Sequence, residues 1–220
     1  MEYVVFDALA ESHSGRWNLT GGVNFYESDV EMNYCSFSNN NSEDALNIYL
    51  STFSLTNSRF DNIMADAFDG DFCNGLVEKC SFETIGNDAL DFSGSEIELK
   101  DIDIKNVKDK GVSAGENSII KGSRITINQC ELGLVSKDKS ILTLDYSRLN
   151  NVTVPYLVFQ KKGEFGSAKL VLSNFQALNY KEKYLVEQGS DVTVNGKVVK
   201  SNYSDVKSVL YGNVYGEMSK

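Results

Sequence analysis

The sequence predicts an all-β solenoid, in which short strands wind into stacked coils. The first observation is a period of 22 residues, visible in the recurrence of Asp44, Asp66 and Asp88. The second is an apolar position two residues further on, which reads Leu46, Phe68, Leu90, Val112 and Leu134. A period near 20 residues with many strand-forming residues is typical of solenoids in which each repeat forms one coil.

Each repeat contains three short segments in which apolar and polar residues alternate. In residues 88–109 these segments are 88–92, 97–99 and 102–104, and Ser-Gly-Ser and Lys-Asp turns separate them. Alternation with a period of two indicates a strand with one buried face, and Gly, Ser and Asp favour turns. We therefore expect three strands per coil and a parallel β-helix with three faces.

A polar column follows the third strand of each coil, and asparagine predominates in it. The column reads Asn40, Asn62, Thr84, Asn106, Asn128 and Asn150. Stacked coils lie about 4.8 Å apart, so asparagine side chains can form a hydrogen-bonded ladder. Asparagine also tolerates the left-handed backbone of a sharp corner. We expect this column to be structural.

The register changes near the C-terminus. Residues 161–166 read as an inserted loop, and the segments after it form a final one or two coils. We assign residues 1–200 to a β-helix of about eight or nine coils. Residues 201–220 form a C-terminal tail or cap, since a bare solenoid end would expose an open row of backbone donors and acceptors.

The charge and the hydropathy exclude several classes of partner. A formal net charge of −10 opposes nucleic acid and anionic lipid but is compatible with divalent cations. No apolar run is long enough to span a bilayer, so we expect no membrane insertion. The start lacks the regions of a signal peptide. Either the protein is cytosolic or a signal has been removed, and the strand-like run 3–6 suggests a piece of a longer chain.

The cysteines do not predict a metal site. Cys35, Cys73, Cys80 and Cys130 have no CxxC spacing, and His13 is the single histidine. This pattern argues against zinc, and we expect four free thiols in or near the core. A disulfide between Cys73 and Cys80 is the alternative.

Four stretches of the repeat carry a resemblance to known proteins. They are residues 42–48, 66–72, 86–95 and 109–118, which read SEDALNI, DAFDGDF, GNDALDFSGS and DKGVSAGENS. They resemble the right-handed parallel β-helix proteins of the pectate-lyase-like (pectin lyase-like) superfamily. More narrowly, they are similar to bacterial β-helix regions found with spore-coat-kinase-like domains. The resemblance covers roughly residues 20–160 and implies a right-handed, single-stranded parallel β-helix.

The resemblance also implies a class of function. Enzymes of this superfamily are lyases, hydrolases and epimerases that act on polysaccharides, often uronates, on the outer face of one sheet. The hydrolase pattern of Gly-His-Gly with Arg-Ile-Lys is absent, as are the Trp-x-Asp-His and Arg-x-Pro-x-x-Arg runs of the lyases. No catalytic residue carries over from these patterns. The resemblance implies an extracytoplasmic or secreted bacterial module.

The first strand of each coil carries the candidate site. Alternation points the apolar column inward, so it predicts that Ala45, Ala67, Ala89 and Gly111 point outward beside a shallow trough. The next outward column supplies the substrate-binding candidates Asn47, Asp69, Asp91 and Ser113.

Asp69 and Asp91 should stack about 5 Å apart, on neighbouring coils. Two carboxylates this close repel each other, so one takes up a proton at a raised pKa or a cation lies between them. Asp71 could supply a third oxygen, which makes calcium the candidate cofactor, held by Asp69, Asp71 and Asp91. A solvated structural pair is the alternative.

The aspartate column at the start, or entrance, of the first strand of each coil has two interpretations as well. Asp44, Asp66 and Asp88 are explained by hydrogen bonds to the backbone of their own turns. Lys110 replaces aspartate in this column, and it either neutralises the carboxylates or acts as a base or a clamp on a uronate carboxylate. Lys110 is therefore the weak catalytic candidate.

These features lead to three hypotheses about function. The first is an extracytoplasmic module that binds or modifies carbohydrate, such as an acidic polysaccharide held through calcium, on an acidic outer face. The second is a structural or adhesion module that meets another protein or a neighbouring domain. The third is a polysaccharide lyase or epimerase.

Overall fold

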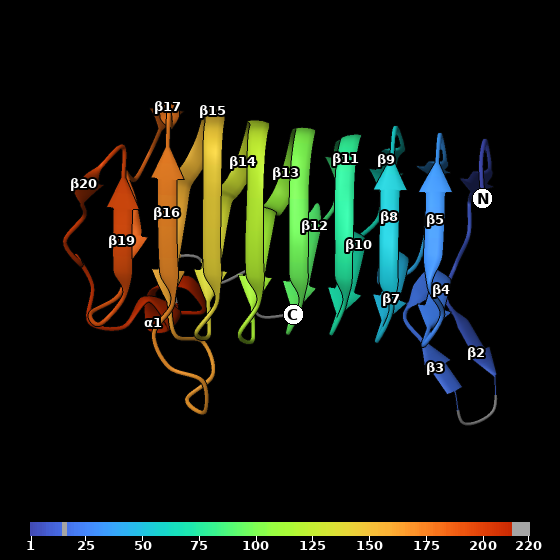
Figure 1. Cartoon of the computed structure of the whole chain (residues 1–220), viewed down its shortest axis with the longest axis horizontal. Coiled ribbons are helices and arrows are strands. Elements are labelled where there is room, and N and C mark those ends of the chain that lie inside the picture. The colour runs from blue at the N-terminus through green and yellow to red at the C-terminus, as the bar shows by residue number, and fades with distance from the viewer. Residues whose placement is uncertain (15–16, 213–220) are drawn as a thin grey trace.

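The computed structural model is a parallel β-solenoid of about eight turns (Figure 1), which confirms the fold class predicted from the repeat. It describes residues 1–14 and 17–212, and for 12–14 and 17–18 it describes the backbone alone. Each coil contributes strands to three faces, which we number in the order that the chain visits them within one repeat.

The first face begins at the aspartate column. Its strands are β4 (Gly21–Tyr26), β7 (Asp44–Tyr49), β10 (Asp66–Asp71), β12 (Leu90–Ser93), the ends of β13 (Glu96–Gly115), β14 (Ile119–Lys137) and β15 (Ile141–Phe159), and β18 (Leu185–Val186).

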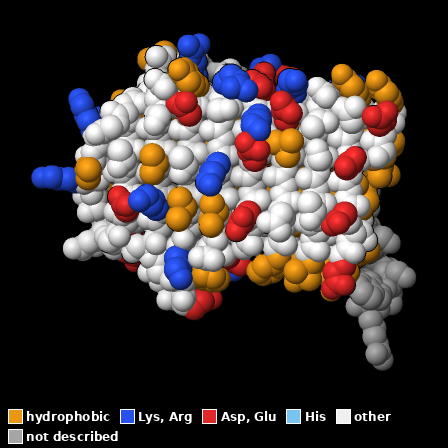
Figure 2. Space-filling model, viewed as in Figure 1, with side chains coloured by type: hydrophobic (Ala, Val, Ile, Leu, Met, Phe, Trp, Pro, Cys, Tyr) orange, Lys and Arg blue, Asp and Glu red, His pale blue; other side chains and the backbone are white. Residues whose placement is uncertain are grey.

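The second face follows the first corner. It contains β5 (Val30–Asn33), β8 (Thr52–Thr56), the start of β11 (Asn74–Ile85), the starts of β13 to β15, β16 (Lys169–Ser173) and β19 (Asp191–Val194). Charged side chains of both signs are scattered over this face among apolar ones (Figure 2).

The third face completes the coil. It contains β1 (Val5–Asp7), β6 (Ser36–Ser38), β9 (Arg59–Ile63), the end of β11, the middle of β13 to β15, and β17 (Gln176–Tyr180).

Like residues stack because the coils pair in register. Phe60 lies between Phe37 and Phe82, with ring centroids 4.4 Å and 4.8 Å away, and all three are buried. Offset aromatic stacking adds to the free energy gained by removing these rings from water. The interior is thus a continuous apolar column that extends from coil to coil.

The corner between the third and first faces has a left-handed residue in each coil. These residues are Ala8, Asn39, Asn62, Thr84, Asn106, Gln129, Asn151 and Asn179. Asn62 Nδ2 donates to Asn39 Oδ1 at 2.8 Å, so the predicted ladder exists in part. The predicted column was one residue out of register at Asn40, Asn128 and Asn150, because the corner shifts by one residue in those coils.

Three short elements lie outside the regular coils. β2 (Ser12–Ser14) and β3 (Trp17–Leu19) form an antiparallel hairpin, and β20 (Lys197–Val198) pairs antiparallel with the last rung, β19. The helix α1 (Val206–Leu210) packs on the outer side of the first face, against Val135 and Leu157, rather than on the end of the last coil. The described part of the tail also bonds to the last coil, because the backbone N–H groups of Asn202 and Tyr203 donate to the carbonyl oxygen of Val186 at 3.0 Å and 3.1 Å. These bonds and the pairing of β20 with β19 occupy part of the open edge, and a cap formed by residues 201–220 stays a prediction. No helix within the described ranges is long and apolar enough to cross a bilayer.

All four cysteines are buried and free, so the alternative of a Cys73–Cys80 disulfide is wrong. The Cys73 thiol donates to the carbonyl oxygens of Ile48 at 3.1 Å and Asp71 at 3.2 Å. Burial raises the pKa of Cys73 to about 11 and that of Cys80 to about 12. A thiolate is the reactive form, so these groups are unreactive at neutral pH.

We therefore expect no thiol of the native protein to react with Ellman's reagent, and all four to react once guanidinium unfolds the chain. The absorbance of the released thionitrobenzoate measures the count. Rapid labelling of even one thiol in the native protein would contradict this burial.

Candidate functional site

The outer side of the first face carries the candidate site. Leu46, Phe68 and Leu90 are fully buried, so the residue that follows each of them projects outward. This outward column reads Asn24, Asn47, Asp69, Asp91 and Ser113 along successive coils. A second outward column, two residues on, reads Tyr26, Tyr49, Asp71 and Ser93.

The small-residue trough is not present. Ala45 is 1% exposed and Ala67 and Ala89 are 0% exposed, and all three belong to the core. Gly111 is buried too. The prediction failed because inward and outward side chains alternate regularly only from the third residue of each strand onward. The first two residues still belong to the corner. The entrance aspartates therefore lie with the outward columns, as the 3.4 Å contact between Asn47 Nδ2 and Asp44 Oδ2 shows.

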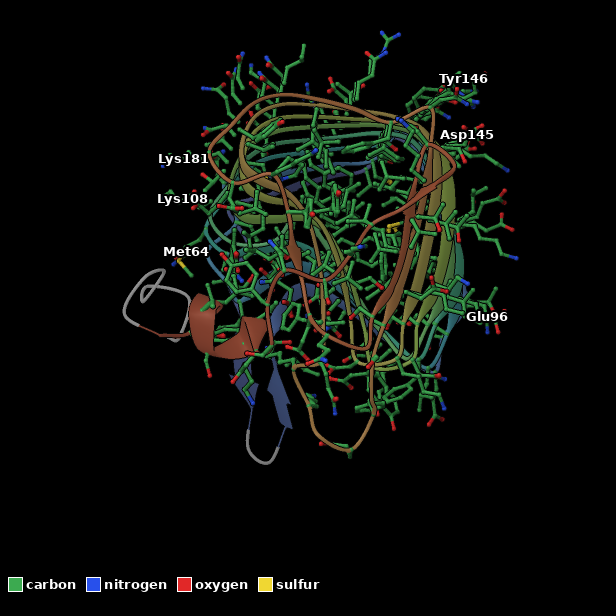
Figure 3. The ribbon with its side chains drawn as sticks, turned by 90° about the vertical axis from the view of Figure 1, so that its left-hand side faces the viewer. Met64, Glu96, Lys108, Asp145, Tyr146 and Lys181 are labelled. Carbon is green, nitrogen blue, oxygen red and sulfur yellow. The ribbon has the colours of Figure 1, made fainter. Side chains whose placement is uncertain are left out.

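The open stretch of the first face has a boundary at each end. The β2–β3 hairpin lies toward the N-terminal end and α1 toward the C-terminal end, on the same side of the solenoid (Figures 1 and 3). Under α1 the outward column becomes apolar, with Val135, Leu157 and Leu185 fully buried. The aspartates lie between these two elements, on coils that neither element's described contacts cover.

Asp69 and Asp91 stack on neighbouring rungs, as the period predicts. Both are partly exposed, and Asp69 Oδ2 accepts a 2.9 Å hydrogen bond from Asn47 Nδ2. The predicted fourth member of this column, Ser113, is 0% exposed, and its hydroxyl accepts a 3.0 Å bond from Lys137 Nζ. The accessible part of the column therefore ends at Asp91.

The two stacked carboxyls have different protonation states. Burial, with repulsion from Asp71 and Asp91, raises the pKa of Asp69 to about 9. Burial also acts on Asp91, but the charges of Lys137 and Lys110 outweigh it and hold the pKa of Asp91 below its usual range. Lys137 Nζ lies 3.6 Å from Asp91 Oδ1. At neutral pH one carboxyl is protonated and its neighbour is ionised.

Lys110 is a buried structural cation. Its Nζ lies 3.1 Å from both carboxylate oxygens of Asp88 and also forms an ion pair with Asp109. Burial opposes the charge, but Asp88 and Asp109 outweigh it and raise the pKa of Lys110. A group that holds its proton this firmly cannot act as a base, which removes the physical argument for Lys110 in catalysis.

The entrance aspartates hold the coils together. Asp66 Oδ1 accepts from the backbone N–H of Asp88 at 2.8 Å, and Asp88 Oδ1 accepts from that of Lys110 at 3.0 Å. The predicted bonds to the residue's own turn are therefore wrong for Asp66 and Asp88, whose carboxylates instead bond the backbone of the next coil.

Asp71 completes the set predicted to bind calcium. Burial and repulsion from Asp91 raise the pKa of Asp71 to about 6. Within the described ranges, no group of three or more His, Cys, Asp or Glu side chains is arranged to hold a metal ion. Asp69, Asp71 and Asp91 therefore lie on neighbouring rungs without forming such a group, and calcium stays a prediction.

Two tyrosines that the sequence reasoning missed flank the aspartates. The rings of Tyr26 and Tyr49 stack with centroids 5.3 Å apart and an interplanar angle of 6°, and Tyr26 is 52% exposed. They line a hollow of about 210 Å³ together with Leu19, Thr20, Asn24, Phe25 and Asn47. Their spacing of 23 residues, one more than the period, concealed them from a search for strict repeats.

Comparisons with known proteins add little beyond this geometry. No protein family and no curated protein matches the sequence. Among solved structures, the catalytic domain of a GH87 α-1,3-glucanase in complex with nigerose matches with a TM-score of 0.33 and 11% identity. A point variant of such a domain in complex with tetrasaccharides gives the same values. The match covers 82% of this chain and 50% of either domain, so this chain spans about half their length.

At this level of similarity no activity carries over to the chain, and its function has to be inferred from its own site. The resemblance to the pectate-lyase-like superfamily and to regions found with spore-coat-kinase-like domains likewise stays a prediction.

The protonated state of Asp69 predicts a pH-dependent stability. The folded chain retains the Asp69 proton up to about pH 9, whereas the unfolded chain releases it near its ordinary pKa of about 3.9. Unfolding therefore releases a proton between these values, and raising the pH through this window destabilises the fold. We expect Asp69→Asn to raise the melting temperature more at about pH 8 than at about pH 4. An equal shift for the exposed control Asp103→Asn would contradict this.

Proposed function

We propose that this chain is a carbohydrate-binding module whose ligand lies along the outer side of the first face. The observation that carries the proposal is the stacked pair Tyr26 and Tyr49 beside Asn47 and Asp69. Sugar rings have apolar faces that pack on aromatic rings, and their hydroxyls bond to amide and carboxyl groups. The two outward columns supply both kinds of group side by side.

The repeat suits a polymeric ligand. The rungs are about 4.8 Å apart, so a chain of similar sugar units that crosses them meets similar groups at regular intervals. Asn24, Asn47, Asp69 and Asp91 form such a series, with both tyrosines at its N-terminal end. We infer that the saccharide crosses several coils between the hairpin and α1.

The protonation pattern favours a neutral saccharide. A protonated Asp69 can donate a hydrogen bond to a sugar oxygen, and an ionised Asp91 can accept one from a hydroxyl. An acidic polysaccharide would need a cation between its carboxylates and Asp71 and Asp91, and calcium would serve that purpose. A saccharide ligand also fits an extracytoplasmic location, which stays part of the proposal.

Glycan-array screening followed by affinity electrophoresis tests this function. We expect Tyr49→Ala to weaken binding of the selected polysaccharide by at least about tenfold, because it removes a ring that lines the hollow and that packs against the exposed ring of Tyr26. The control Tyr34→Ala removes an exposed tyrosine of another corner and should leave binding unchanged. Repeating the titration with calcium and with EDTA measures any contribution of the cation.

Failure to bind any polysaccharide would contradict the proposal. It would favour the alternative of a structural or adhesion module, whose outer face meets a protein or a neighbouring domain. Equal losses in the two tyrosine variants would place the saccharide elsewhere on the surface.

The carboxyl pair favours glycoside hydrolysis as a second candidate function. A protonated carboxyl beside an ionised one is the pattern that glycoside cleavage requires. Asp69 would donate its proton to the glycosidic oxygen, and Asp91 would either attack the anomeric carbon or take a proton from the attacking water. The lyase and epimerase alternative lacks a comparable base, because Lys110 is protonated.

Asp91→Asn separates hydrolysis from binding. If the chain is a hydrolase, this variant should release reducing ends from the bound polysaccharide at least about a hundredfold more slowly. Binding in affinity electrophoresis should persist, since the amide retains an acceptor oxygen. Absence of reducing-end release by the native protein would remove this candidate and leave the binding function standing.

A further inference from the structure

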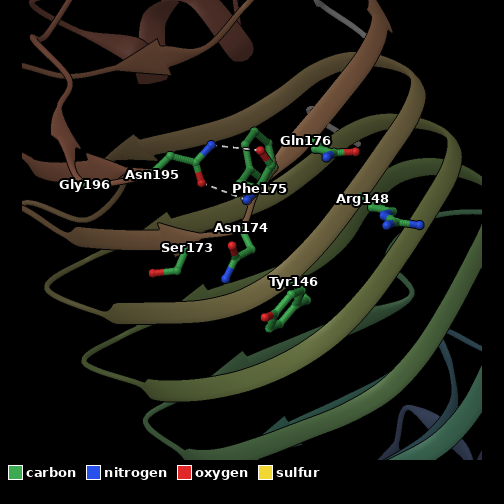
Figure 4. Close-up of a pocket in the computed structure, with 8 residues that line it drawn as sticks. All are labelled: Tyr146, Arg148, Ser173, Asn174, Phe175, Gln176, Asn195 and Gly196. Carbon is green, nitrogen blue, oxygen red and sulfur yellow. Dashed lines mark hydrogen bonds between the residues drawn. The ribbon is translucent and has the colours of Figure 1, made fainter.

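A second hollow lies at the corner between the second and third faces. It has a volume of about 570 Å³ and is lined by Tyr146, Arg148, Ser173, Asn174, Phe175, Gln176, Asn195 and Gly196 (Figure 4). Tyr146 marks this corner in the view down the solenoid, across the coils from α1 (Figure 3). The hollow is therefore separate from the candidate site on the first face.

Arg148 is an uncompensated cation in an acidic chain. Its neighbours on the adjacent rungs are Thr126 and Gln176, both uncharged. Within residues 1–14 and 17–212, no carboxylate forms an ion pair with Arg148. By contrast, Arg124 on the preceding coil pairs with Asp101, with Nη2 2.8 Å from Oδ2. Arg148 is exposed, so its guanidinium is available to pair with an external anion.

The wall of the hollow is held in place by its own hydrogen bonds. Asn195 bonds the backbone N–H and carbonyl of Phe175 at 2.8 Å and 2.9 Å (Figure 4). Asn174 Nδ2 donates to Asp145 Oδ1 at 2.8 Å, and the backbone N–H of Tyr146 donates to the same oxygen at 3.0 Å. Oδ1 of Asp145 is thus hydrogen-bonded within the wall, and Asp145 forms no ion pair with Arg148.

The remaining groups suit a sugar. Tyr146 is 58% exposed and offers a ring face, while Ser173 and Gln176 offer a hydroxyl and an amide. Arg148 and Gln176 also line a neighbouring hollow of about 400 Å³ with Thr126, Asn128, Asn150 and Leu178, among others. Arg148 therefore borders both hollows, and a ligand longer than one sugar unit can extend from one to the other onto the third face.

We propose that this corner binds an acidic saccharide. Arg148 takes the sugar carboxylate in a bidentate pair, Tyr146 packs against the sugar ring, and Gln176 bonds a hydroxyl. The proposal is independent of the first-face function, since the two sites share no residue and favour saccharides of different charge.

Titration of the ¹⁵N-labelled protein with D-glucuronate, followed by NMR, tests the proposal. We expect saturable shifts of the amide signals of Asn174, Gln176 and Gly196, and weaker binding at higher salt concentration. D-glucose, acetate and inorganic phosphate serve as separate arms, and each should bind at least about tenfold more weakly, because each lacks either the carboxylate or the sugar ring.

Two variants and a control assign the roles. Arg148→Gln should weaken glucuronate binding by at least about tenfold, because it removes the charge and keeps polar groups. Tyr146→Asn removes the ring while tolerating the left-handed backbone there (φ 52°), and should also weaken it. Arg124→Gln, which removes a paired arginine, should have no effect.

Three outcomes would overturn the proposal. Equal binding of glucose would show that Arg148 does not select the charge, and equal binding of acetate or phosphate would show an anion site without sugar recognition. Unchanged binding in Arg148→Gln would place glucuronate elsewhere.

Discussion

Parallel pairing of each coil with the next, in register, is the constraint on which the rest of this structure depends. It places chemically alike side chains about 4.8 Å apart in every column. Apolar and aromatic columns gain from this arrangement, as the stack of Phe37, Phe60 and Phe82 shows. Serine columns gain as well, because the hydroxyl of Ser118 accepts from the backbone of Ser95, and Ser140 does the same for Ser118. Columns of like charge do not gain, since the charges repel each other from rung to rung.

The aspartates of the first face show how the chain offsets this repulsion. Asp66 and Asp88 each accept a backbone N–H from the next coil, and the column then changes to Lys110. In the outward column, Asn47 donates to Asp69, which retains its proton, and only Asp91 is ionised, beside Lys137. The formal charge of the sequence therefore overstates the negative charge of this face at neutral pH.

The same columns divide the first face along its length. From the N-terminal end of this face, aromatic and amide groups come first and carboxyls follow. The buried amines of Lys110 and Lys137 come next, and apolar residues covered by α1 come last. A ligand site can form only in the part that remains open, between the hairpin and the helix. The unpaired Arg148 lies on another corner, where the columns carry neutral residues on either side of it.

The sequence by itself determined the solenoid, its period and the stacking of Asp69 on Asp91, because a fixed repeat specifies which residues become neighbours whatever the details of each coil. It also determined that Leu46 and Phe68 are core residues. Only the tertiary structure decided that Ala45, Ser113 and Lys110 are buried. It also decided that Tyr26 and Tyr49 adjoin the aspartates. These features depend on where a corner ends and alternation begins, and on what α1 covers. A shift of one residue at a corner changes which side chains face outward, and the repeat does not encode that shift.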